Sequence, residues 1–152
     1  MPKGKSKPDE VPGLKRGMPM GVLWTVWPLD DQMKSWLDST GIKYPKEPSR
    51  FPTGREIKDV VRGLVGFNVE INDNGVDSYW QASIVSKQGG TGEWTLLNIT
   101  EYSGDDAEQK LWFEKGWESL ITSILRELSK HSGPLVLIPD VGGDPIIISN
   151  ET

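Results

Sequence analysis

The stretch SGPLVLIPDVGGDPIIIS, residues 132–149, decides most of the fold assignment. It contains two continuous apolar runs, Leu135–Ile138 and Ile146–Ser149, on either side of a loop of Pro, Asp, Val and Gly. Short apolar runs without alternation are typical of strands that are buried on both faces. We therefore expect two short strands at the centre of a sheet, joined by a turn.

A long amphipathic segment, Asp105–Lys130, precedes these strands. From Phe113 to Leu128 its apolar residues recur every three or four positions, which is the spacing of one helix face. A glycine inside a helix costs about 1 kcal/mol relative to alanine, so Gly116 indicates that another element approaches closely there. The Gly-Pro pair at 133–134 stops the helix. The pattern predicts one helix over the whole segment.

Two shorter helices are predicted nearer to the N-terminus. The first begins near Pro28 with Asp30 as its N-cap, and it ends at Gly41. Its apolar residues share one face and are expected in the core: Leu29, Met33, Trp36 and Leu37. The second begins at a T-x-x-E capping box, Thr53 to Glu56, and ends at Gly66.

The middle of the chain predicts strands. Phe67–Asn72 alternates apolar and polar residues, and further strands fit Tyr79–Val85 and Glu93–Thr100, with short turn-forming links between them. The apolar segment Met20–Trp27 is a candidate leading strand. The expected fold is α+β: two layers, a mainly antiparallel sheet of about five strands, helices on one face, and the order αα-βββ-α-ββ.

The length of 152 residues suits one domain, which we expect to span residues 20–152. Residues 1–19 are rich in Lys, Gly and Pro, carry a net charge of +3, and are expected to form a flexible basic arm. The rest of the chain carries −8. An acidic surface repels phosphate, so nucleic acid is expected to bind only weakly, through the arm.

Several site classes are excluded by composition. The chain has no cysteine and one histidine, which excludes disulfides, iron–sulfur clusters, zinc fingers, thiol catalysis and multi-histidine metal sites. No cofactor or metal is expected. No secretory signal pattern is visible, and no apolar stretch approaches the roughly 20 residues of a spanning helix. We therefore expect a cytoplasmic protein without membrane contact.

Tryptophan is abundant, with seven residues against three Phe and three Tyr. Exposed tryptophans often mark a contact with a protein or a sugar, because the ring combines a large apolar face with one hydrogen-bond donor. Trp24, Trp27 and Trp112 are the candidates for a partner interface. A place in the core is the alternative for each of them.

The loop Asp140–Asp144 is a second candidate site. Asp140 and Asp144 flank Gly142 and Gly143, so the loop offers carboxylate oxygens to Ca²⁺ or Mg²⁺, and backbone N–H groups to a phosphate. The spacing is not that of an EF-hand, no lysine follows as in a P-loop, and the acids oppose an anion. Asp and Gly are also the ordinary residues of a tight turn.

No set of catalytic residues emerges, because no G-x-S-x-G pattern or triad accompanies His131. The sequence favours a non-catalytic, soluble protein-interaction module. An immunity-type inhibitor of a basic toxin or nuclease, or a regulatory partner protein, fits its acidic charge. The alternative is a small-ligand or cation-binding protein, or an enzyme, that uses the Asp140–Asp144 loop.

Overall fold

The computed structural model describes residues 22–73, 78–88 and 92–149. Its elements are β1 (Leu23–Pro28), α1 (Asp31–Thr40), α2 (Gly54–Arg62), β2 (Phe67–Asp73), β3 (Trp80–Ser86), β4 (Trp94–Ile99), β5 (Leu111–Glu114), α3 (Glu118–Ser132), β6 (Leu135–Pro139) and β7 (Ile146–Ile148). The predicted arm, residues 1–19, lies outside the described residues, as do the centres of the turns predicted after β2 and β3.

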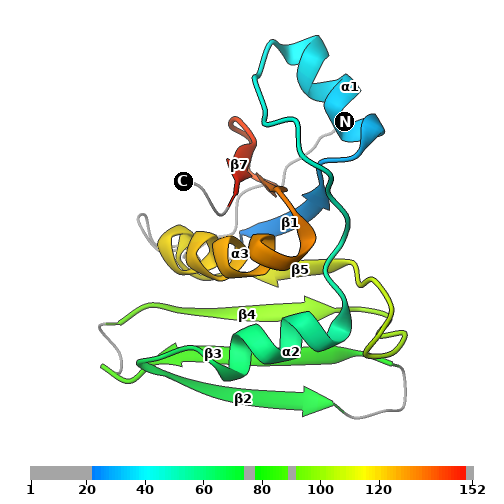
Figure 1. Ribbon diagram of the computed structural model, residues 1–152. Helices are drawn as coiled ribbons and strands as arrows, with labels where there is room; N and C mark the ends of the chain where they lie inside the picture. The colour runs from blue at the N-terminus through cyan, green and yellow to red at the C-terminus, as the bar shows by residue number, and fades with distance from the viewer. Residues whose placement is uncertain (1–21, 74–77, 89–91, 150–152) are drawn as a thin grey trace.

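The strands of the described chain form one antiparallel sheet in the order β2-β3-β4-β5-β1-β6-β7 (Figure 1). The α+β class with an antiparallel sheet is confirmed, but the sheet has seven strands and not about five. The two strands beyond these five are β1, which matches the candidate leading strand Met20–Trp27, and β5, and they lie side by side in the sheet. The element order is therefore β-αα-βββ-β-α-ββ and not αα-βββ-α-ββ. β1 also pairs with β6, so it joins the two halves of the sheet.

The predicted helix over residues 105–130 is wrong in its first half. Leu111 and Phe113 point into the core from β5, and α3 begins only at Glu118. Between them, Lys115 and Gly116 take positive φ angles of 60° and 107°, which a right-handed helix does not contain. A strand end, a turn and a helix start therefore produce the same apolar spacing as one long helix.

α2 and α3 cover one face of the sheet (Figure 1) and form the main core with it. Ile57 and Val61 of α2, with Ile121 and Ile124 of α3, are fully buried there. They pack against the inward side chains of all seven strands, among them Trp24, Val69, Trp80, Leu97, Phe113, Leu137 and Ile148. This core separates the sheet into a helix-covered face and an opposite face.

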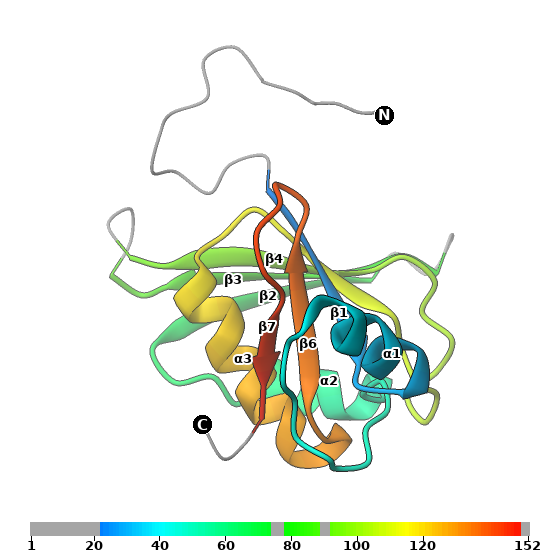
Figure 2. The same ribbon diagram turned by 90° about the horizontal axis from the view of Figure 1, so that it is seen from above.

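α1 lies on the opposite face, which corrects the expectation that the helices share one side. Leu29 and Leu37 bury Val136 of β6, and Ile147 of β7 packs on the same cluster. Figure 2 shows α1 and α3 on opposite sides of β6 and β7. Trp36, which was expected in the core, does not belong to this cluster and is 43% exposed.

The position of α1 explains why the last two strands are apolar on both faces. β7 is an edge strand and β6 lies next to it, so the expected central position is wrong. Val136 and Ile147 are covered by the α1 cluster, whereas Leu137 and Ile148 belong to the main core. The continuous apolar sequences of β6 and β7 therefore reflect burial of both faces of these strands, and not a position in the middle of the sheet.

The predicted starts of the two shorter helices, α1 and α2, are confirmed in detail. Asp30 caps α1 by accepting a hydrogen bond from the backbone N–H of Met33, and the Thr53–Glu56 capping box opens α2. α2 stops at Gly63, before the expected Gly66. None of the helices in the described ranges is long and apolar enough to cross a membrane.

Candidate functional site

We call the side chains of β1–β5 that point away from α2 and α3 the open face. They include Leu23, Thr25, Trp27, Glu70, Gln81, Ser83, Val85, Trp94, Leu96, Trp112 and Glu114. α1 packs only on the β6–β7 end of this side of the sheet. Trp27, Leu23 and Val85 are the large apolar side chains of this face that are most exposed.

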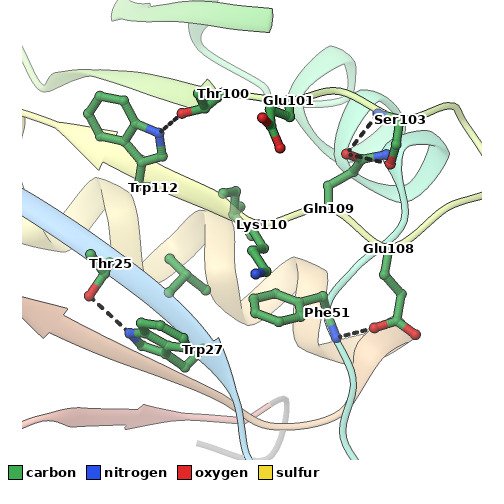
Figure 3. A pocket seen from close by; sticks show the side chains of 12 residues that line it. Thr25, Trp27, Phe51, Thr100, Glu101, Ser103, Glu108, Gln109, Lys110 and Trp112 are labelled. Atoms are coloured by element: carbon green, nitrogen blue, oxygen red, sulfur yellow. Dashed lines mark hydrogen bonds between the residues drawn. The ribbon is translucent and has the colours of Figure 1, made fainter. Parts of the chain in front are cut away.

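A hollow of about 510 Å³ lies at one end of the open face (Figure 3). We call it the aromatic hollow, because Trp27, Phe51 and Trp112 line it. β1 contributes Trp27 and β5 contributes Trp112, and the pairing of Thr25 with Trp112 brings these two strands together. The polar and charged residues around the rings include Thr25, Thr100, Glu101, Glu108, Gln109 and Lys110.

Both indole rings in the aromatic hollow are held by hydrogen bonds. Trp27 Nε1 donates to Thr25 Oγ1 at 3.1 Å, and Trp112 Nε1 donates to Thr100 Oγ1 at 3.0 Å (Figure 3). Because each N–H already has an acceptor, neither ring needs a polar partner from outside. The indoles therefore offer mainly their apolar faces to a ligand.

Phe51 reaches the hollow from the connector between α1 and α2. Its backbone N–H donates to Glu108 Oε1 at 3.2 Å, and its ring centroid lies 6.4 Å from that of Trp27 at an angle of 51°. This is a favourable spacing for a tilted aromatic pair. Phe51 was not among the residues predicted from the sequence, because its only signal is that it is a large aromatic residue in a proline-rich connector.

The neutral amide in the hollow is used within the protein. Gln109 is only 1% exposed, and its Nε2 donates to the carbonyls of Gly104 and Ala107 at 2.7 and 3.1 Å. The side chains of Glu101 and Lys110, by contrast, are exposed and make no hydrogen bond or ion pair with the described part of the chain. The groups left for a ligand are therefore charged or aromatic.

The three tryptophan candidates separate into two groups. Trp27 and Trp112 lie together in the aromatic hollow, with Trp27 being 41% exposed. Trp24 is 7% exposed and belongs to the main core. Trp24 and Trp27 are three residues apart on β1, and because side chains alternate along a strand they point to opposite faces.

The Asp140–Asp144 loop connects β6 to β7. Asp140 Oδ1 accepts a hydrogen bond from the backbone N–H of Leu23 at 3.0 Å, and the N–H of Asp140 donates to the carbonyl of Leu23 at 2.9 Å. This carboxylate therefore extends the pairing of β1 with β6. Gly142, Gly143 and Asp144 are exposed, and the described residues contain no group of three or more His, Asp or Glu that could hold a metal ion.

Comparison of the chain with protein-family models, with curated proteins and with solved structures finds no significant match. The function is therefore inferred from the geometry of the open face. Its distinctive feature is the aromatic hollow, which is lined by rings from two strands and a connector together with the charged side chains of Glu101, Glu108 and Lys110.

Proposed function

We propose that the protein is a non-catalytic interaction module that binds another protein through its open face. The observation that carries this proposal is the aromatic hollow, in which Trp27, Phe51 and Trp112 stand together where no described helix covers the sheet. Tryptophan is enriched among the residues that contribute most to protein–protein binding. Rings held in place by hydrogen bonds also lose little conformational freedom on binding.

The charges of the open face favour a basic partner. Glu70 and Glu114 lie on its strands, and Glu101 and Glu108 lie at the aromatic hollow, against the single cation Lys110 among the residues that line it. Complementary charge accelerates association and excludes acidic competitors. An immunity-type inhibitor of a basic toxin or nuclease, or a regulatory partner of a basic protein, belongs to this class.

The experiment compares two tryptophans of equal exposure. Trp27 is 41% exposed on the open face, and Trp36 is 43% exposed on α1 and does not line the hollow. The wild type, Trp27→Ala and Trp36→Ala proteins are each used to capture partners from lysate of the native cell. We expect the wild type and Trp36→Ala to retain the same stoichiometric partner, and Trp27→Ala to lose it.

The purified complex then shows where the partner sits. Hydrogen exchange should slow in β1, β5 and the connector that carries Phe51 when the complex forms, because these segments surround the hollow. Equal capture by Trp27→Ala and wild type would exclude the open face as the contact surface. A protein that captures no stoichiometric partner and does not self-associate would contradict the interaction module itself.

A further inference from the structure

Most of the neutral hydrogen-bonding groups in the aromatic hollow already have partners within the protein. The N–H groups of both indoles are bonded to threonine hydroxyls, and the amide of Gln109 is bonded to backbone carbonyls. A neutral, hydroxyl-rich ligand such as a sugar would therefore find few free donors and acceptors here. Among the described residues that line the hollow, the side chains of Glu101 and Lys110 have no partner, and Glu108 has one carboxylate oxygen without a hydrogen bond.

The balance of charge in the hollow favours a cation. Glu101 and Glu108 line it together with Lys110, so the carboxylates outnumber the ammonium group. Glu108 uses one oxygen for the backbone N–H of Phe51. Lys110 is exposed, and its flexible four-carbon stem allows the ammonium to turn into solvent when another cation enters.

Aromatic faces add a second attraction for a cation. The ring centroids of Trp27 and Phe51 lie 6.4 Å apart at an angle of 51°, so the two rings line the same part of the hollow. A guanidinium group is planar and weakly hydrated, and it stacks on an indole more readily than an ammonium group does. The hollow of about 510 Å³ exceeds one side chain, which leaves room for the backbone that carries it.

We propose that the aromatic hollow receives an arginine side chain of the partner protein, with its guanidinium group between the ring of Trp27 and the carboxylate of Glu101. This inference rests on the proposed function, since it names the group of the partner that the open face recognises. It also assigns opposite roles to two neighbouring charges. Glu101 attracts the arginine, and Lys110 opposes it.

The test uses the indole N–H signals of Trp27 and Trp112 in nuclear magnetic resonance spectra of the full chain. The probe is N-acetyl-arginine amide, and N-acetyl-citrulline amide is the control, because it has nearly the same shape without the charge. We expect saturable shifts of both indole signals with the arginine compound and much weaker binding of the citrulline compound. Equal binding of the two, or no saturable shift, would overturn the inference.

Three variants test the roles of the charges. Glu101→Gln should weaken arginine binding about threefold, and Lys110→Met should strengthen it by a similar factor, as expected for partly exposed ion pairs. Glu70→Gln is the matched control on the open face, because Glu70 lies on the edge strand β2 and does not line the hollow. Unchanged affinity in Glu101→Gln, or an equal loss in Glu70→Gln, would contradict the assignment.

The two proposals fail in different ways. If arginine amide does not bind and partner capture still depends on Trp27, the open face is the interface and another group of the partner fills the hollow. If partner capture does not depend on Trp27, the proposed function itself is wrong, whatever the arginine probe does.

Discussion

Gly116 occupies a position between β5 and α3 that no larger residue can share. Its φ angle is 107°, and a Cβ atom built there would lie 2.3 Å from Oγ1 and 2.8 Å from Cα of Thr95. The backbone of β4 cannot move away without disturbing its pairing with β3 and β5. We predict that Gly116→Ala lowers the free energy of unfolding by about 3 kcal/mol, from backbone strain and overpacking together.

Urea-induced unfolding measures this loss, and Gly142→Ala provides the control. Gly142 has a similar φ angle of 95°, but nothing lies within 4 Å of its added Cβ atom. Its substitution should therefore cost only the strain of the left-handed conformation, about 1–2 kcal/mol. Equal losses in the two variants would show that contact with Thr95 contributes nothing.

The sequence predicted some of the residues that line the hollow but not all of them. Trp27 and Trp112 were candidates because of their type, and both do line the hollow. Trp24 was a candidate for the same reason, but its face depends on which side of the sheet the helices cover. Phe51 reaches the hollow through a connector of irregular shape, and no periodic pattern predicts such a path.

The first turn of α2 contains Glu56, a carboxyl group whose pKa is held well below its ordinary value. Arg50 donates two hydrogen bonds to Glu56, at 2.9 and 2.8 Å, and the backbone N–H of Thr53 donates a third at 2.9 Å. The bidentate contact with Arg50 is the main cause that lowers the pKa of Glu56 from 4.5 to about 2. This network joins the connector to the start of the helix.

The network gives a prediction for stability against pH. A carboxyl whose pKa is depressed by folding stabilises the protein fully above its unfolded pKa of 4.5, and this contribution is lost as the pH falls towards about 2. Glu56→Gln should therefore be less stable than wild type at neutral pH, by about 1 kcal/mol. The difference should shrink between pH 4.5 and about 2.

Urea-induced unfolding of both proteins at neutral pH, and at steps through the acid range, checks this prediction. Thr53→Ala is a useful companion, because it removes the hydroxyl that caps α2 but leaves the ion pair in place. Its loss of about 1 kcal/mol should therefore depend less on pH. A difference between wild type and Glu56→Gln that stays constant down to pH 2 would exclude Glu56 as the source.

Elements with local signals were predicted better than elements without them. α1 and α2 begin where their caps indicate, because a cap is formed by residues three positions apart. β5 was missed because its apolar residues continue into α3 with helical spacing. β6 and β7 were found, but the pattern that shows two buried faces does not show that α1 covers one of them.

At the scale of the whole molecule, β1 makes the sheet continuous. β2–β5 are consecutive along the chain and pair with their sequence neighbours, and β6 and β7 form a hairpin. Among the strands that the structure describes, only β1 pairs with both β5 and β6 and so connects these two groups. It also contributes Trp24 and Val26 to the main core. The continuity of the sheet therefore depends on β1, which pairs with segments far away in the sequence.

Two shortened chains test this dependence. A chain that begins at residue 29 lacks β1, so β5 and β6 are left with unpaired edges and the core loses two large side chains. We predict that it shows no cooperative thermal unfolding, because the lost strand pairing and core burial are comparable with the roughly 5–15 kcal/mol by which native domains are stable. A chain that begins at residue 20 keeps β1 and should unfold with the same free energy as the full chain, since residues 1–19 offer little apolar surface to bury. Cooperative unfolding of the chain that begins at residue 29 would show that the sheet does not depend on β1. A lower stability of the chain that begins at residue 20 would show that residues 1–19 pack on the domain.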